Sequence, residues 1–404
     1  MKRSRIDALL MEQEGLRSLT RRDIEAVQLG KLNRLLRREK LRNGFYRDLP
    51  EHLSSLEELS SLPFTTDEDL AHHAPTLLLT SQSQVSRILS DATSGTTGAA
   101  KRVFYTEADC ENTVRLYAAG LGELVFPHST CMVCFPFSGP QGLGELIAEA
   151  ITRLGARPLK LGPGLTYGEY RAVMEKEKPD TFVGMPVQLL SLLRTCGKGS
   201  LQRALVSGDA CPAAVTEACE KILGTKLFPH YGSREMGMAG AITCPAHEGM
   251  HLREHCVIAE IIDESGNVLP KGEWGELVIT TIGMEALPLI RYRTGDYTRI
   301  LPLPCPCGSE TLRLDSLHRK SSGGPDILAL DELLFPLSGL IDFTAEQKET
   351  TLRLSVLHTG TLTESAVRLA LSALAPDTQL QLRPVTDGDK ALYPAKRRIL
   401  SSQP

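Results

Sequence analysis

DATSGTTGAAK, at residues 91–101, is a run of glycines and hydroxyl side chains that ends in a lysine and follows a β-rich run at 85–89. Glycines let the backbone turn tightly, so that successive N–H groups can point at the oxygens of a phosphate. The hydroxyls add donors, and the lysine adds a mobile positive charge for the β- and γ-phosphates. The spacing differs from that of P-loop nucleotidases, because no Ser or Thr follows the lysine. The segment predicts a phosphate-binding loop, with a flexible surface loop as the alternative; its residues are Ser94, Gly95, Thr96, Thr97, Gly98 and Lys101.

Short β-rich runs and helical stretches alternate on the C-terminal side of this loop. The runs at 131–137, 181–186 and 204–208 are predicted strands, and 143–154 and 212–223 are predicted helices. Strands that alternate with helices in this way favour a largely parallel sheet covered by helices.

The flanking regions have different patterns. Residues 1–60 have leucines at helical spacing, and Thr65 with Glu68 predicts a capping box at the start of another helix. Beyond residue 250, β-runs separated by turn residues predict antiparallel hairpins or a small barrel. These β-runs are Val257–Ile262, Gly275–Thr281 and Asp296–Leu301.

A short run of breakers, Ser321-Ser-Gly-Gly-Pro325, is the best predicted linker. We therefore expect an α/β protein with a large N-terminal domain, at residues 1–318, of mostly parallel sheets covered by helices plus a small barrel-like part. A hinge at 319–324 would lead to a small C-terminal α+β lid at 325–404.

Composition excludes several classes of protein. The net charge of −4 and pI of about 6.2 give no electrostatic reason to expect nucleic acid or an anionic membrane as a partner. The basic cluster between Arg34 and Arg42 has helical spacing and is interpreted as a solvated helix face. No stretch reaches about 18 apolar residues, the N-terminus lacks a signal-peptide pattern, and ten cysteines in 404 residues do not form a secreted disulfide framework. A reduced cytoplasmic protein is predicted.

Four segments together resemble the adenylate-forming superfamily, which includes acyl-CoA synthetases, peptide-synthetase adenylation domains and luciferases. SGTTGxxK at 94–101 resembles its phosphate loop, and VSGDA at 206–210 resembles its adenine-side strand end. HYGSREM at 230–236 resembles its Tyr-Gly-x-x-Glu segment, and RYRTGD at 291–296 resembles its ribose-binding motif. The matches occur in the order that the superfamily requires.

Within that superfamily the chain is similar to phenylacetate–CoA ligases. The similarity is almost continuous over 251–296, includes LPFTTDEDL at 62–70, and covers roughly residues 45–320. The resemblance implies activation of a small, aromatic or other apolar carboxylic acid as its acyl-adenylate with ATP and Mg²⁺, followed by transfer to CoA. It also implies a homodimer.

The same resemblance assigns roles to individual residues. Glu235 stands where the family places a magnesium ligand, and Tyr231 would pack on the adenine. Asp296 would accept hydrogen bonds from the ribose hydroxyls. The alternatives are a helix N-terminal acid, a core tyrosine and a turn residue, respectively. The remaining nucleotide contacts would come from Ser207, Gly208, Asp209, Gly232, Ser233 and Arg319, where Asp209 replaces the family's more usual glutamate.

The end of the predicted strand at 131–137 and the loop after it, at 135–139 and 142–144, resemble the family's strand and loop that wall the acyl pocket. Their aromatic members suit a flat apolar acid, although aromatic residues of strands are also common in plain cores. The predicted pocket residues are Phe135, Phe137, Gly139, Gly208 and Met236.

Cysteines also suggest a metal site. Cys305 and Cys307 form a tight thiolate pair, and some relatives in the family carry a structural zinc. The matching positions here are Cys244, His251, Cys305 and Cys307, with His247, His255 and Cys256 as rival ligands and a metal-free cluster as the alternative. The pair Cys131 and Cys134 lies in a predicted strand and is interpreted as buried small apolar residues.

The resemblance weakens towards the C-terminus. In the family the C-terminal domain swings between two poses, a hinge residue follows Gly-Arg, and a terminal lysine contacts the adenylate. Lys320 follows Arg319 without the glycine, and Lys396 is the candidate adenylation lysine in a segment whose register could shift by two residues. A basic C-terminal tail is the alternative for this segment.

The leading hypothesis is therefore an acid–CoA ligase, with catalytic Lys101, Glu235 and Lys396. Alternatives are an adenylating enzyme that transfers the acyl group to a carrier-protein thiol or another acceptor, and a catalytically silent nucleotide-binding regulator. A zinc-dependent interaction module is weaker, because the phosphate loop would then have no purpose.

Overall fold

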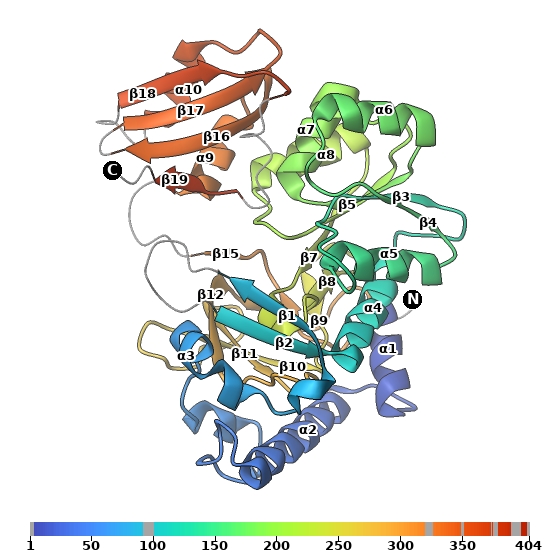
Figure 1. Ribbon diagram of the computed structural model, residues 1–404, viewed down its shortest axis with the longest axis vertical. Helices are drawn as coiled ribbons and strands as arrows, with labels where there is room; N and C mark the ends of the chain where they lie inside the picture. Colours follow the sequence, from blue (N-terminus) through green and yellow to red (C-terminus); the bar gives the residue numbers. More distant parts are fainter. Residues whose placement is uncertain are drawn as a thin grey trace. The chain divides into compact units, whose positions relative to one another are not determined.

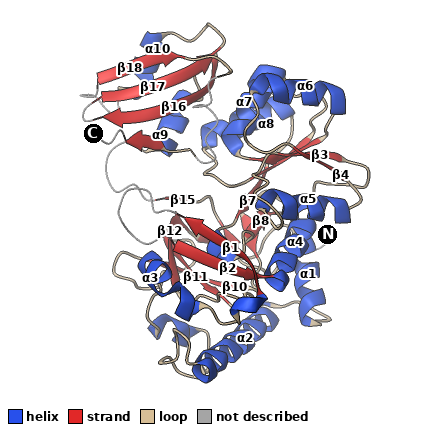
Figure 2. Cartoon of the chain, viewed as in Figure 1, coloured by secondary structure: helices blue, strands red, loops and turns tan. Residues whose placement is uncertain are grey.

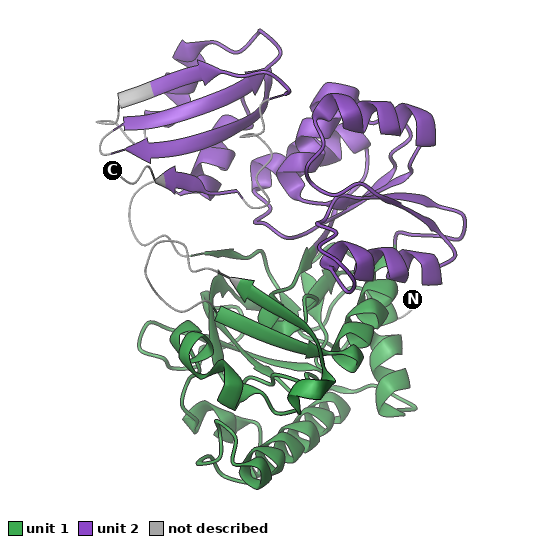
Figure 3. Ribbon diagram, viewed as in Figure 1, with its two compact units in different colours: residues 1–123, 230–320 green, residues 124–229, 321–404 purple. Residues whose placement is uncertain are grey.

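The computed structural model describes residues 4–91, 101–319, 326–348, 351–372, 374, 379–388 and 397–401 (Figure 1). The chain forms two compact units, each made from two stretches of sequence (Figure 3). The first contains Met1–Glu123 and His230–Lys320, and the second contains Leu124–Pro229 and Ser321–Pro404. Among the described helices, none combines the length and the apolar character needed to cross a membrane.

Two capped helices open the first unit. In α1 (Arg5–Glu14) and α2 (Arg21–Arg42), the side chains of Ser4 and Thr20 accept hydrogen bonds from amides of the first turn. Every third or fourth position of α2 is buried, and its arginines lie mainly on the exposed side. The prediction of helix over residues 1–60 is confirmed for α1 and α2, and residues 43–56 form turns and loops.

Helix α3 (Asp67–Leu77) corrects the predicted cap by one residue. Thr66, not Thr65, caps the helix, and Asp69, not Glu68, completes the capping box. The hydroxyl of Thr65 instead donates to the carbonyl of Ile290 at 2.6 Å. Because the Thr65 hydroxyl makes this tertiary hydrogen bond, Thr66 rather than Thr65 caps the helix.

The predicted strand at 85–89 is β1 (Val85–Asp91), and it pairs antiparallel with β2 (Lys101–Thr106), with Asp91 opposite Lys101. These two strands flank the predicted phosphate loop in the sequence. Helix α4 (Glu107–Leu121) follows β2 directly and begins at the capping box of Thr106 and Asp109.

Antiparallel strands make up the rest of the first unit, as predicted for the sequence after residue 250. One sheet has the order β10-β11-β12-β15 and therefore two edges: β10 (Val257–Ile262), β11 (Gly275–Thr281), β12 (Tyr292–Thr298) and β15 (His318–Arg319). Another ladder runs in the order β7-β8-β9-β14-β13: β7 (Phe228–Tyr231), β8 (Ala241–Thr243), β9 (Met250–Leu252), β14 (Arg313–Leu314) and β13 (Ile300–Leu301). The chain passes between the two units within β7.

The second unit contains the predicted parallel sheet, in the order β4-β3-β5-β6-β7. Its own strands are β3 (Thr130–Val133), β4 (Arg157–Lys160), β5 (Thr181–Gly184) and β6 (Arg203–Val206). Helix α5 covers one face and α6 to α8 the other (Figure 2): α5 (Leu143–Arg153), α6 (Tyr167–Glu177), α7 (Pro186–Cys196) and α8 (Ala213–Leu223). Cys131 and Cys134 are fully buried, as predicted, and burial raises the pKa of both thiols.

The C-terminal part of the second unit is an α+β layer with the strand order β18-β17-β16-β19. Its elements are α9 (Ile327–Leu334), β16 (Leu340–Lys348), β17 (Thr351–His358), α10 (Glu364–Leu371), β18 (Gln379–Pro384) and β19 (Ile399–Ser401). Its apolar residues, including Phe335 and Phe343, belong to the same hydrophobic core as Leu189 and Leu190 of α7. Of the predicted hinge at 319–324, residues 320–324 lie outside the described residues, and Arg319 is the last residue of β15.

Candidate active site

Lys101 lies at the centre of a cluster of acceptors in the first unit. Its Nζ lies 2.6 Å from Glu235 Oε1 and 3.1 Å from Asp67 Oδ1, and it donates to the hydroxyl of Tyr292 at 3.2 Å. Burial works against the charge of the ammonium, but the two carboxylates outweigh it and raise the pKa of Lys101. The lysine that ends the predicted phosphate loop is therefore held as a cation beside Glu235.

Glu235 is held by a rigid turn. It lies in the 3-10 turn η3 (Arg234–Met236), which ends at Gly237 with a positive φ of 76°. The hydroxyl of Tyr105 donates to the carbonyl of Arg234 at 2.7 Å, and that of Thr113 donates to the carbonyl of Gly237 at 2.6 Å. These bonds from β2 and α4 fix the turn on both sides of the carboxylate, which is buried.

The two residues Gly232 and Ser233, shortly before Glu235, are also closely packed. A Cβ on Gly232 would come within 2.4 Å of the carbonyl oxygen of Met238, so a larger residue does not fit there. The hydroxyl of Ser233 is buried and has no hydrogen-bond partner within the described part of the chain. Met236, predicted in the acyl pocket, is fully buried against Gly240.

Asp296 lies between two donors. The hydroxyl of Tyr231 donates to its Oδ2 at 2.8 Å, and Arg319 Nε lies 3.3 Å from its Oδ1. Arg319 lies directly opposite Asp296 in the β12–β15 ladder. Burial works against the charge of Arg319, but Asp296, helped by the carboxylates of Asp67 and Glu235, outweighs it and raises the pKa of the guanidinium. The predicted ribose and magnesium residues are therefore within electrostatic reach of one arginine.

The remaining predicted nucleotide and pocket residues lie in the second unit. Gly208, just after β6, has a φ of 85°, and a Cβ there would lie 2.9 Å from the ring of Phe135. Asp209 accepts hydrogen bonds from the amides of Ala210 at 2.9 Å and Arg397 at 3.0 Å. Phe135 is buried, whereas Phe137 is half-buried below the ammonium of Lys160, 5.9 Å from the ring centre.

Ser207 is buried beside this glycine, and Gly139, with a φ of 81°, lies in the same loop after β3 as the two phenylalanines. Five of the predicted phosphate-loop residues, Ser94 to Gly98, lie outside the described residues, as do Lys320 and Lys396.

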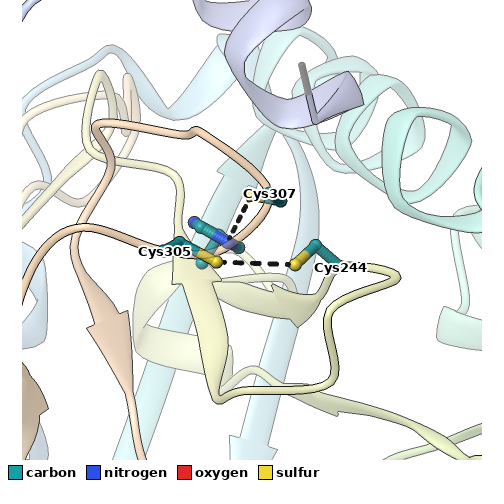
Figure 4. A group of neighbouring side chains, drawn as sticks. Cys244, Cys305 and Cys307 are labelled. Atoms are coloured by element: carbon teal, nitrogen blue, oxygen red, sulfur yellow. Dashed lines mark hydrogen bonds between the residues drawn. The ribbon is translucent and has the colours of Figure 1, made fainter. Parts of the chain in front are cut away.

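The predicted zinc ligands come together in the first unit. Cys244, His251, Cys305 and Cys307 are all buried, and their ligand atoms lie within 4.8 Å of one another. Cys244 Sγ lies 3.8 Å from Cys305 Sγ, and Cys307 Sγ lies 3.5 Å from His251 Nε2 (Figure 4). The rival ligands His247, His255 and Cys256 are not members of this group.

The chemistry of this cluster suits a metal. The other ring nitrogen of His251, Nδ1, lies 2.8 Å from the hydroxyl of Thr311, which orients Nε2 towards the thiols. Burial lowers the pKa of His251 to about 4, so the imidazole is neutral at pH 7, as a ligand must be. Three thiols and one imidazole make a closed tetrahedral set of the structural kind.

The family model described as AMP-binding enzyme matches residues 91–285, which include the loop before Lys101 and the turn that carries Glu235. A phenylacetate-coenzyme A ligase of Thermus thermophilus is 29% identical over 395 residues, covering 90% of this chain and 85% of the relative. One of Aromatoleum evansii is 30% identical over 308 residues, covering 72% of this chain and 69% of the relative.

The chain belongs to the phenylacetate-coenzyme A ligase family.

Solved structures agree on the fold of this family member. A 2-hydroxyisobutyryl-CoA ligase in the postadenylation state, in complex with 2-HIB-AMP, superposes with a TM-score of 0.76 at 18% identity. The match covers 94% of this chain and 90% of that chain. The predicted α/β fold of the adenylate-forming superfamily is therefore confirmed.

Sequence reasoning missed two members of the cluster in this ligase-family protein. Asp67 is the first residue of α3 and accepts from both Lys101 and the hydroxyl of Tyr292. Tyr292 lies inside the motif that was recognised, so its position carried a signal that was assigned to Asp296 alone. Asp67 lies in the segment LPFTTDEDL that resembles the family, but that resemblance assigns it no role, and its partners are remote in the sequence.

Proposed function

We propose that this chain converts a small apolar or aromatic carboxylic acid, ATP and CoA into an acyl-CoA, AMP and pyrophosphate. In the first step a carboxylate oxygen attacks the α-phosphorus, and the bond to the departing pyrophosphate breaks. In the second step the CoA sulfur attacks the acyl carbon and AMP leaves. Membership of the phenylacetate-coenzyme A ligase family supports both steps.

The observation that carries the proposal is the buried contact of 2.6 Å between Lys101 Nζ and Glu235 Oε1. A cation next to the predicted phosphate loop and beside a buried carboxylate supports the proposed role of this pair. Both reactants are anionic, so neutralising charge and aligning the phosphate are the main tasks of the site. Lys101 would exchange one of its three acceptors for a phosphate oxygen when ATP binds.

Glu235 would hold Mg²⁺, and the ion would supply further neutralisation of the phosphates. The buried carboxylate suits this role, since its partner in the described residues is a lysine that the incoming phosphates can draw away. Asp296, ordered by Tyr231 and Arg319, would accept the ribose hydroxyls. Lys396 stays the candidate for the adenylation lysine.

Zn²⁺ would bind the four-residue cluster of Cys244, His251, Cys305 and Cys307 in a structural role. The convergence of their ligand atoms supports this part of the proposal. All ten cysteines are free, which suits a reduced protein in the cytoplasm. A homodimer is proposed from the resemblance to the family.

A pyrophosphate-release screen over carboxylic acids, with and without CoA, tests the function. We expect release that depends on the acid, an acyl-CoA by mass spectrometry, and a loss of at least about 100-fold in kcat for Lys101→Ala and Glu235→Gln. Release without any thioester would favour another acceptor. ATP binding by titration without release from any acid would favour a silent regulator, and variants equal to the parent would refute the site.

A further inference from the structure

The side chain of Arg397 is largely buried, although it lies in a basic run that could have been a solvated tail. Its side chain is 9% exposed, whereas that of the next residue, Arg398, is exposed. The guanidinium donates two hydrogen bonds to Asp331 of α9, from Nη2 to Oδ1 at 2.7 Å and from Nε to Oδ2 at 3.3 Å. It also donates through Nη1 to Asp342 of β16 at 2.9 Å.

The surroundings of the guanidinium complete this set of contacts. Nη1 also donates to the carbonyl of Phe343 at 3.1 Å, and the cation lies 4.6 Å from the centre of that ring. The hydroxyl of Tyr167 donates to the second oxygen of Asp342 at 2.5 Å. The planar guanidinium bonds two carboxylates and packs on the ring of Phe343 at the same time, and a lysine ammonium cannot make this set of contacts.

The backbone of Arg397 reaches the loop after β6. Its amide donates to Asp209 Oδ2 at 3.0 Å, and Asp209 Oδ1 accepts from the amide of Ala210. Both carboxylate oxygens are thus fixed, one of them by a residue 188 positions away. Asp209 belongs to the segment that resembles the adenine-side strand end.

Two other carboxylates of the C-terminal segment act on the same side of the second unit. Glu332 accepts from the amides of Ala213 and Ala214 at 2.6 and 2.8 Å, at the beginning of α8. Asp387 accepts from the amides of Tyr167 and Gly168 at 2.9 and 2.8 Å, at the beginning of α6. Carboxylates are favourable at helix N-termini. The loop that contains Asp209 is therefore attached to the C-terminal segment at two points, at Asp209 itself and where α8 begins.

We infer that Arg397 is a positioning residue for nucleotide binding, acting through Asp209. Its side chain fixes the residues just before β19 on α9 and β16, and this places the Arg397 amide so that it orients the Asp209 carboxylate and the loop after β6. The inference rests on the proposed function, since it takes that loop to contact ATP. Arg397 itself touches no substrate in this scheme.

A double-mutant cycle on the KM for ATP tests the inference. Arg397→Gln keeps the backbone amide but loses the guanidinium, and we expect its KM for ATP to rise at least about 10-fold while the KM for the acid changes less than about 2-fold. Asp209→Ala should raise the same constant. Because Arg397 acts through Asp209, the double variant should be no worse than the worse single variant, within about 2-fold.

Arg398→Gln is the matched control and should behave as the parent. Arg397→Lys should recover only part of the loss. If Arg397→Gln does not fold, Asp331→Asn removes the carboxylate that accepts two hydrogen bonds from the guanidinium and should raise the same KM. A KM for ATP within about 2-fold of the parent in a folded Arg397→Gln, or effects that multiply in the double variant, would overturn the inference.

Hydrogen exchange separates this inference from the proposed function. In Arg397→Gln, without any ligand, the amides at 207–212 should exchange faster than in the parent and in Arg398→Gln. If the parent activates no acid and this difference is present, the proposed function fails while the structural coupling stands. If the parent is active and the exchange at 207–212 is unchanged, the inference fails alone.

Discussion

Lys101 donates to acceptors from three separate segments, and these acceptors differ in burial. The side chain of Asp67 is 60% exposed, whereas that of Glu235 is 8% exposed. An exposed ion pair contributes about 0–1 kcal/mol, whereas removing one partner of a buried pair costs several-fold more. Glu235 is therefore the main partner of Lys101, and Asp67 makes a weaker contact with the ammonium on its solvent-exposed side.

This difference predicts unequal effects of two isosteric substitutions. Asp67→Asn should raise the KM for ATP by no more than about 5-fold and leave kcat almost unchanged, because an exposed pair is lost. Glu235→Gln should lower kcat by at least about 100-fold. Steady-state kinetics at saturating acid measure both. Equal losses of kcat in the two variants would contradict this division of roles.

Local motifs mark three of the predicted site residues in the first unit. Lys101, Glu235 and Asp296 each belong to a recognisable segment, and the structure brings the first two into contact. Asp67 lies in the recognised segment LPFTTDEDL, but its role could not be inferred there, because it reaches Lys101 only through the packing of α3 on β2. The hydrogen bond between Arg397 and Asp209 could not be predicted either, because it too joins residues that only tertiary packing brings together.

At the scale of elements, hydrophobic alternation located strands well. The β-runs predicted at 257–262 and 275–281 are β10 and β11 with the same bounds. The buried parallel strands were predicted too long at their C-terminal ends, since β3 ends at Val133 and the apolar run continues to 137. The apolar run continues into the loop that follows the parallel strand. Hydrophobicity alone therefore does not show where the strand's hydrogen bonding to its neighbours ends.

The cysteine cluster joins the segment around β8 and β9 to the loop before β14, so its metal should stabilise the first unit. We expect purified protein to contain about one zinc per chain, and Cys305→Ser to lose the zinc and lower the melting temperature. Cys110→Ser, which alters a buried cysteine outside the cluster, is the control. Elemental analysis and calorimetry measure both quantities. Parent protein that is zinc-free and insensitive to chelators would contradict the site.

His230 on β7 predicts a loss of stability in acid. It is buried and stacks on Tyr117 with ring centres 4.9 Å apart, and burial, aided by Arg253, lowers its pKa to about 3. Between that value and the unfolded pKa of about 6.5 the unfolded chain binds more protons, so stability falls as the pH falls. This histidine contributes about 1.4 kcal/mol per pH unit in that window.

Urea unfolding followed through Trp274, the single tryptophan, reports on the first unit. The parent should lose stability between pH 6.5 and pH 4 more steeply than His230→Gln, by up to one proton per chain. Identical slopes would show that His230 titrates alike in both states.

At the scale of the whole molecule, the C-terminal segment shares a core with residues 124–229 inside the second unit. Phe343 of β16 is fully buried in this core, whereas Leu369 of α10 is 77% exposed. Phe343→Ala should cost about 3–5 kcal/mol, and Leu369→Ala less than about 0.5 kcal/mol. Because the core is shared, the amides of α7 should lose protection from hydrogen exchange together with those of β16. Loss confined to the C-terminal segment would contradict a shared core.

The central claim is that Lys101 and Glu235 act together on the polyphosphate of ATP during acid activation. Exchange of labelled pyrophosphate into ATP, driven by the best acid and without CoA, reports on this step alone. We predict exchange by the parent that needs both the acid and Mg²⁺, and a loss of at least about 100-fold in Lys101→Ala and in Glu235→Gln. Exchange at the parent's rate in both folded variants would contradict the claim.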